Sequence, residues 1–135
     1  MSNISFVILV IAVFVAYTVV KNLRLSGKLG GKIPYKRISA KEAWDMMQNQ
    51  EPLTVVDVRT KGEWANGHIK GAINIPVETI GSVKPKKLND ADMPIMVYCQ
   101  SGARSSQAAR RLSALGYTQI YDLGGIHRWT YGTVR

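Results

Sequence analysis

The chain has 135 residues and carries 18 lysines and arginines against nine aspartates and glutamates, a formal net charge of +9. This length accommodates one domain with a short appendage. The charge alone would suggest nucleic-acid binding, but the sequence has no recognition motif and no interleaved aromatic residues, so we expect no nucleic-acid partner. One cysteine excludes an intrachain disulfide, and with two separated histidines it cannot assemble a zinc site; we expect no metal and no cofactor.

An apolar run at residues 4–20 opens the chain, and only Ser5 and Thr18 within it are clearly polar. At ~1.5 Å per residue the run spans about 25 Å, the short end for a transmembrane helix. A cleaved signal peptide is the main alternative, but no basic residue precedes the run and no small-residue cleavage site follows it. The sequence therefore predicts a retained transmembrane helix over residues 1–20.

Basic residues crowd the C-terminal flank of this run, with Lys21, Arg24, Lys28 and Lys32 in a segment that holds no acid. Together with its glycines, this composition predicts a basic flexible linker over residues 21–34. Basic flanks mark the cytoplasmic side of a span, so we expect a single pass through the cell's inner membrane, with the N-terminus outside and the domain in the cytoplasm. Membrane lipid is then an expected partner, since each lysine or arginine near an anionic leaflet adds about 1 kcal/mol of attraction.

The remaining residues, 35–135, alternate between strand and helix signals and predict a single domain. Apolar segments predict five strands, at residues 36–38, 53–57, 72–75, 95–98 and 120–123. Ser39 and Glu42 form a capping box that predicts a helix to about Gln48, and the apolar face of residues 105–115 predicts another. This alternation is typical of an α/β fold in which helices cover both faces of a parallel sheet.

Less regular segments complete the predicted domain. The sequence of residues 77–93 predicts an irregular connection between the third and fourth strands, with one helical turn. Gly124 and Gly125 are expected to break the last strand, and a short helix that carries Trp129 should follow. Ligands of parallel sheets bind at the carboxyl ends of the strands, which directs attention to the residues that follow them.

Cys99, the single cysteine, lies where one such strand gives way to a short loop rich in glycine and serine and then to a helix. A helix N-terminus carries roughly +0.5 of an elementary charge and unsatisfied N–H donors. These favour the thiolate, which is the nucleophilic form of cysteine. The alternative is a small buried apolar residue, the commonest role of a free cysteine, but the composition of the loop favours a reactive thiol.

Three separated motifs resemble the rhodanese homology domain, in order and spacing, over residues 36–131. They are Asp57-Val58-Arg59 with residues 63–76, the segment 98–105, and Gly124-Gly125 with Trp129. The resemblance implies a rhodanese-like fold with a five-stranded parallel sheet, in a single-domain, membrane-anchored sulfurtransferase. It also implies that a persulfide on Cys99 takes sulfur from a sulfane-sulfur donor such as thiosulfate and passes it to a thiol, or to cyanide.

The loop after Cys99 is expected to bind the substrate. Its residues are Gln100, Ser101, Gly102, Ala103, Arg104 and Ser105. Gly102 lets the chain curl without steric cost, so that the N–H groups of residues 100–105 can surround the sulfur. Arg104 is expected to close the ring and favour an anionic donor; a solvated charge at a helix start is the alternative.

Other motif residues are expected to support the structure around this loop. They are Asp57, as a brace or salt-bridge partner, His68, Gly124, Gly125 and Trp129. Arg59 stays open between a structural role and a place in the substrate pocket.

Two other functions are compatible with the same motifs. Phosphatases that share the fold have a loop of the form Cys-x5-Arg, and arsenate reductases use related loops, whereas Cys99 and Arg104 enclose four residues. The shorter loop between Cys99 and Arg104 suits one sulfur atom on the cysteine better than a tetrahedral phosphate. The second alternative is a non-catalytic module that docks a partner at the membrane, since domains can keep a fold and lose its chemistry.

Overall fold

The structure is a computed structural model that describes residues 3–25, 34–49 and 52–135. The chain divides into two units, residues 1–32 and 33–135. The first contains helix α1 (Asn3–Leu25), which extends into the segment predicted as a linker. The rest of that segment up to residue 33 lies outside the described residues.

A membrane span is not supported by α1. Across the described parts of the chain, no helix combines the length and the apolar character that crossing a bilayer requires. The prediction rested on an apolar run of about 25 Å, which is shorter than the ~30 Å hydrocarbon core. The location and orientation inferred from the basic flank stay predictions.

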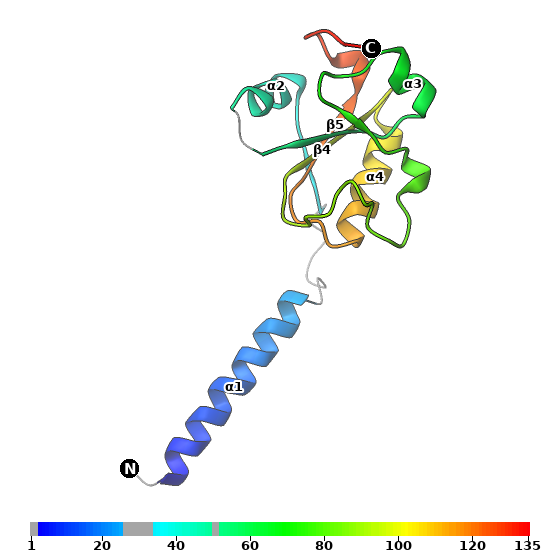
Figure 1. The fold of residues 1–135 in the computed structure, drawn as a ribbon. Coiled ribbons are helices and arrows are strands. Elements are labelled where there is room, and N and C mark those ends of the chain that lie inside the picture. The colour runs from blue at the N-terminus through cyan, green and yellow to red at the C-terminus, as the bar shows by residue number, and fades with distance from the viewer. Residues whose placement is uncertain (1–2, 26–33, 50–51) are drawn as a thin grey trace. The chain divides into compact units, whose positions relative to one another are not determined.

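The second unit is built on a five-stranded sheet in which all strands are parallel, as predicted (Figure 1). In spatial order the strands are β1 (Lys36–Arg37), β5 (Ile120–Gly125), β4 (Ile95–Cys99), β2 (Thr54–Asp57) and β3 (Ile73–Asn74). Strand β4 occupies the centre and is buried along its whole length. Its carboxyl end therefore lies in the middle of the sheet edge.

Helices cover both faces of the sheet (Figure 1). On one face α4 (Ala103–Ala114) buries Ala108 and Leu112, together with Val56 of β2. On the other face α2 (Ala40–Gln48) buries Ala43, together with Val55 of β2. Adjacent strand residues point to opposite faces, which is why β2 reads as a continuous apolar run in the sequence.

The capping box predicted for α2 is present. The Ser39 hydroxyl accepts from the Glu42 N–H at 3.1 Å, and the Ser39 N–H donates to the Glu42 carboxylate at 2.7 Å. The helical turn predicted between the third and fourth strands is the 3-10 helix η1 (Val77–Thr79).

A second capping box begins helix α3 (Lys61–Asn66), which is not among the elements predicted from the sequence. The Thr60 hydroxyl accepts from the Glu63 N–H, and the Glu63 carboxylate accepts from the Thr60 N–H, both at 3.2 Å. The helix places Glu63 beside the loop that follows β4, as described below.

The last strand is longer than predicted, because Gly124 and Gly125 continue it. They pair with Tyr98 and Cys99, after a register shift between Val97 and Tyr98. The Gly124 N–H donates to the buried Asp122 carboxylate at 2.9 Å, which holds the irregular backbone in the sheet. The helical turn that follows, η2 (Ile126–Arg128), ends at Trp129 instead of carrying it.

Candidate active site

Cys99 is the last residue of β4 and lies at the carboxyl edge of the sheet. Its residue surface is 1% exposed, and it belongs to the apolar core on the α4 face. The sulfur nevertheless has a polar partner, since the Gly102 N–H donates to Sγ at 3.0 Å. The thiol is therefore buried, with a loop amide turned toward it.

Gly102 makes this contact possible through its backbone conformation. Its φ of 111° and ψ of −16° lie in the left-handed region, which side chains disfavour. It is the N-cap of α4, and its carbonyl accepts from the Ser106 N–H at 3.2 Å and the Ser105 hydroxyl at 3.0 Å. The sulfur is thus held at the N-terminal end of a 12-residue helix, where the helix dipole favours an anion.

Arg104 lies in the first turn of α4, and its guanidinium is paired with a carboxylate. Its two terminal nitrogens donate to the two Glu63 oxygens, at 2.7 Å and 3.0 Å. This bidentate pair joins α4 to α3, and the binding of an anionic donor by Arg104 stays a prediction. Glu63 was given no role from the sequence, although the Thr60–Glu63 spacing signals the capping box that holds it in place.

The ion pair between Arg104 and Glu63 persists over most of the pH range. Hydrogen bonds from Arg104 lower the pKa of Glu63 to about 2, with a smaller contribution from Thr60. The same hydrogen bonds raise the pKa of Arg104. A carboxyl whose pKa is lowered by folding stabilises the fold above its ordinary pKa of 4.5, and this contribution is lost as the pH falls toward 2.

Asp57 and Arg59 form a buried ion pair at the end of the neighbouring strand β2. The Asp57 carboxylate accepts from Nη2 of Arg59 at 2.6 Å, from Nε at 3.1 Å and from the Arg59 backbone N–H at 2.9 Å. Burial alone would lower the pKa of Arg59, but the hydrogen bonds and charge of Asp57 outweigh it and raise the pKa. Asp57 is thus the counter-ion of Arg59.

Arg59 in turn contacts two other segments of the site. Its Nη2 donates to the Gly67 carbonyl at 2.7 Å, and its Nη1 lies 3.4 Å from Oε1 of Gln100. The guanidinium also lies over the Tyr98 ring, 5.7 Å from the centroid. These contacts join Arg59 to the loop and to Gly67, and a place for Arg59 in the substrate pocket stays a prediction.

The far side of the loop is packed closely against the end of β5. The His127 ring nitrogen Nδ1 lies 2.9 Å from the Gln100 carbonyl. A methyl group on Gly125 would lie only 2.6 Å from the same carbonyl and 2.3 Å from the His127 ring. Gly125 is therefore required for the approach of β5 to the loop.

Replacing Gly125 with alanine is expected to reduce catalytic efficiency by at least about tenfold, because displacement of the Gln100 carbonyl moves the loop that holds the sulfur. The kcat/KM of the reaction proposed below for Cys99 measures this effect. Gly81→Ala is the matched control, since a methyl group there meets no atom within 4 Å. Equal activities of the two variants would contradict the close packing described here.

His68 and Trp129 contribute to packing away from the sulfur. Nδ1 of His68 lies 2.8 Å from the Trp64 carbonyl, and its ring stacks on Trp64 with centroids 4.2 Å apart. Trp129 packs against Trp44, with centroids 6.0 Å apart, and against Tyr131, at 4.9 Å.

A cavity of about 370 Å³ lies on the side of the loop that faces β1 and β5. The loop contributes Ser101, Gly102 and Ala103 to its lining, and the opposite walls include Arg37 and Arg128. Cys99 is not among the residues that line this cavity, whereas Gly102, whose N–H donates to the sulfur, is one of them.

The arrangement around Cys99 suits a nucleophilic sulfur. The Gly102 N–H donates to the sulfur at the N-terminal end of α4, a position that favours an anion. A buried ion pair, Asp57–Arg59, and a partly exposed one, Glu63–Arg104, contact the surrounding loop.

Comparison with known proteins agrees with this geometry. The rhodanese-like domain family matches residues 39–131. The thiosulfate sulfurtransferase GlpE of Coxiella burnetii is 30% identical over 96 residues, which cover 70% of this chain and 87% of that protein. The thiosulfate sulfurtransferase PspE of Escherichia coli is 35% identical over 71 residues, which cover 53% and 68%. A rhodanese-related protein from Thermoplasma volcanium has a crystal structure with a TM-score of 0.62 and 32% identity, over 74% of this chain and 98% of that chain.

Proposed function

We propose, since this chain belongs to the rhodanese-like domain family, that it is a sulfurtransferase that works through a persulfide on Cys99. Its donor is a sulfane-sulfur compound such as thiosulfate, and its acceptor is a thiol, which cyanide replaces in assays. The observation that carries the proposal is the hydrogen bond from the Gly102 N–H to the sulfur of the single cysteine, at the start of α4.

The proposed reaction has two steps. The Cys99 thiolate attacks the outer sulfur of the donor, a new S–S bond forms, and with thiosulfate the electron pair of the broken bond leaves on sulfite. An acceptor thiolate then attacks the terminal sulfur of the enzyme persulfide and regenerates the Cys99 thiolate. Each step is a nucleophilic displacement at sulfur, so ping-pong kinetics are expected.

The surroundings of Cys99 support this assignment over phosphate chemistry. A phosphatase needs a free guanidinium to hold its anion, whereas Arg104 is bound to Glu63 through both terminal nitrogens. The sulfur of a persulfide needs only a small pocket with N–H donors, and Gly102 supplies one.

Mass spectrometry of the intact protein tests the proposal. After exposure to thiosulfate and removal of excess reagent, the protein should gain the mass of one sulfur atom, on the peptide that contains Cys99. Addition of cyanide should remove that mass and release thiocyanate. Release of phosphate from an aryl phosphate without any gain of sulfur would overturn the proposal in favour of a phosphatase.

A further inference from the structure

The two arginines beside the candidate active site are both neutralised by carboxylates. Arg59 is paired with Asp57 in the core, and Arg104 is paired with Glu63 through two hydrogen bonds. The other loop side chains are those of Gln100, Ser101, Ala103 and Ser105, and none of them carries a charge. Both arginines therefore have a carboxylate partner, the Asp57–Arg59 pair being buried and the Arg104–Glu63 side chains being 31% and 33% exposed.

What remains positive near the sulfur is the N-terminal end of α4, with the amide of Gly102. The partial charge of a helix end is roughly +0.5, which suits a single negative charge on sulfur. A thiolate or a persulfide anion on Cys99 has this charge. A dianion brings a second negative charge that none of the described side chains of the loop compensates.

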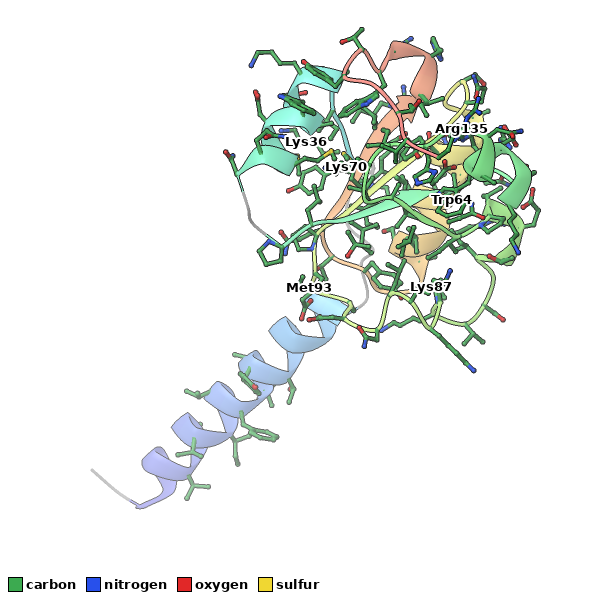
Figure 2. All side chains as sticks on the ribbon, turned by 45° about the horizontal axis from the view of Figure 1, so that its top comes forward. Lys36, Trp64, Lys70, Lys87, Met93 and Arg135 are labelled. Carbon is green, nitrogen blue, oxygen red and sulfur yellow. The ribbon has the colours of Figure 1, made fainter. Side chains whose placement is uncertain are left out.

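Other positive side chains of the domain line two cavities. Arg37 and Arg128 line the cavity on the other side of the loop. Lys61 and Lys87 line a separate cavity of about 520 Å³, to which Trp64, Ile73 and Asn74 also contribute. Trp64 and Lys87 are labelled in Figure 2. Neither cavity includes Cys99 among its lining residues.

We propose that Glu63, by binding Arg104, selects sulfur donors that carry no more than one negative charge, such as an organic persulfide, over the thiosulfate dianion. This inference rests on the proposed function and specifies its donor. Glu63 is a positioning residue in this scheme, because it acts through Arg104. The low pKa of Glu63 keeps the pair charged throughout the neutral range.

The donor reaction balances with an organic persulfide. The Cys99 thiolate attacks the outer sulfur of the donor R–S–SH and forms the enzyme persulfide. The donor S–S bond breaks, its electron pair leaves on R–S⁻, and the proton stays on the transferred sulfur or passes to the departing thiolate. The step needs neither an oxidant nor a reductant.

A matched pair of donors tests this selection. Thiosulfate is a dianion, and methanethiosulfonate is its monoanionic analogue, in which a methyl group replaces one charged oxygen. Both present a terminal sulfur to Cys99. The measured quantity is the ratio of kcat/KM for the two donors, with kcat and KM determined separately, in the wild type and in variants of Glu63.

Glu63→Gln should raise kcat/KM for thiosulfate about tenfold, mainly through a lower KM, because it frees the Arg104 charge. The value for methanethiosulfonate should change less than about threefold, since a monoanion gains less from that charge. The double variant Glu63→Gln with Arg104→Gln removes both charges and should return the donor ratio to near its wild-type value. If Glu63→Gln folds poorly, the donor ratio of the double variant still measures the effect of removing both charges of the ion pair.

Glu42→Gln is the matched control, because Glu42 caps α2 as Glu63 caps α3, with the same loss of one charge. It should leave the donor ratio unchanged. An equal change for both donors in Glu63→Gln, or a weaker reaction with thiosulfate alone, would overturn the selection while leaving sulfur transfer intact. If neither donor places sulfur on Cys99 in the wild type, the proposed function fails and the inference fails with it.

Discussion

Cys99→Ser is expected to abolish sulfur transfer, with a loss of activity of at least about a thousandfold. A serine hydroxyl stays protonated at neutral pH and attacks sulfur poorly, whereas the Cys99 thiolate is the group that forms the new bond. The side chain keeps nearly the same size, and its oxygen can accept the hydrogen bond that the Gly102 N–H gives to Sγ. The loss is therefore a chemical effect with little change in shape.

The assay is formation of thiocyanate from thiosulfate and cyanide, together with the mass of the protein after exposure to the donor. The variant should gain no sulfur, and its free energy of unfolding should stay within about 1–3 kcal/mol of the wild type, the cost of placing a hydroxyl in a mostly apolar site. Retention of more than about 1% of the activity would show that the displacement does not occur at this residue.

Asp57→Ala is expected to produce the largest loss of stability among single substitutions near the site. Arg59 is 5% exposed, and Asp57 binds its guanidinium and its backbone N–H. Removing the carboxylate leaves a buried positive charge without its counter-ion, which costs about 3–5 kcal/mol. For a domain of this size the melting temperature should fall by roughly 15–30 °C.

Urea denaturation of the wild type and of Asp57→Ala measures the difference in their free energies of unfolding. Asp45→Ala is the control, because the Lys41–Asp45 ion pair on α2 has a similar 2.8 Å separation but its side chains are 78% and 54% exposed. That substitution should cost at most about 0.5 kcal/mol. The double variant Asp57→Leu with Arg59→Met should recover much of the stability, since it leaves no unpaired charge. A loss below about 1 kcal/mol in Asp57→Ala would mean that Arg59 reaches water or another acceptor.

The strands and the longer helices of the domain were accessible to prediction because local patterns determine them. Ser39 and Glu42 signal the start of α2 within four residues, and the apolar run around Val55 and Val56 marks a strand that is buried on both faces. The position of Cys99 at a strand end and the curl at Gly102 follow from the same kind of local signal.

The pairing of Arg104 with Glu63 could not be predicted from local sequence patterns. Arg104 and Glu63 are 41 residues apart, and their pairing depends on the packing of α3 against α4, which no local pattern encodes. The capping box of α3 was present in the sequence, but it signals only that Glu63 faces the helix start. A free arginine and a paired arginine look the same in the sequence, although they differ in what they can bind.

The end of β5 was mispredicted for a related reason. Paired glycines usually interrupt a strand, whereas here Gly124 and Gly125 pair with Tyr98 and Cys99 because the sheet accommodates a register shift. The absence of a side chain at Gly125 serves the close approach of the Gln100 carbonyl. A glycine that lacks a side chain for packing reasons resembles one that ends a strand, and only the neighbouring segments distinguish the two.

The burial of Cys99 has a consequence for the lifetime of the stored sulfur. With the residue only 1% exposed, bulky electrophiles and large reductants cannot reach Sγ without displacing the loop. In the persulfide that we propose, the outer sulfur lies one bond beyond Sγ, so a small thiol has less far to reach than it would to contact Sγ itself. Under the proposed function, burial would protect the enzyme persulfide from large reductants and restrict its acceptors to small thiols.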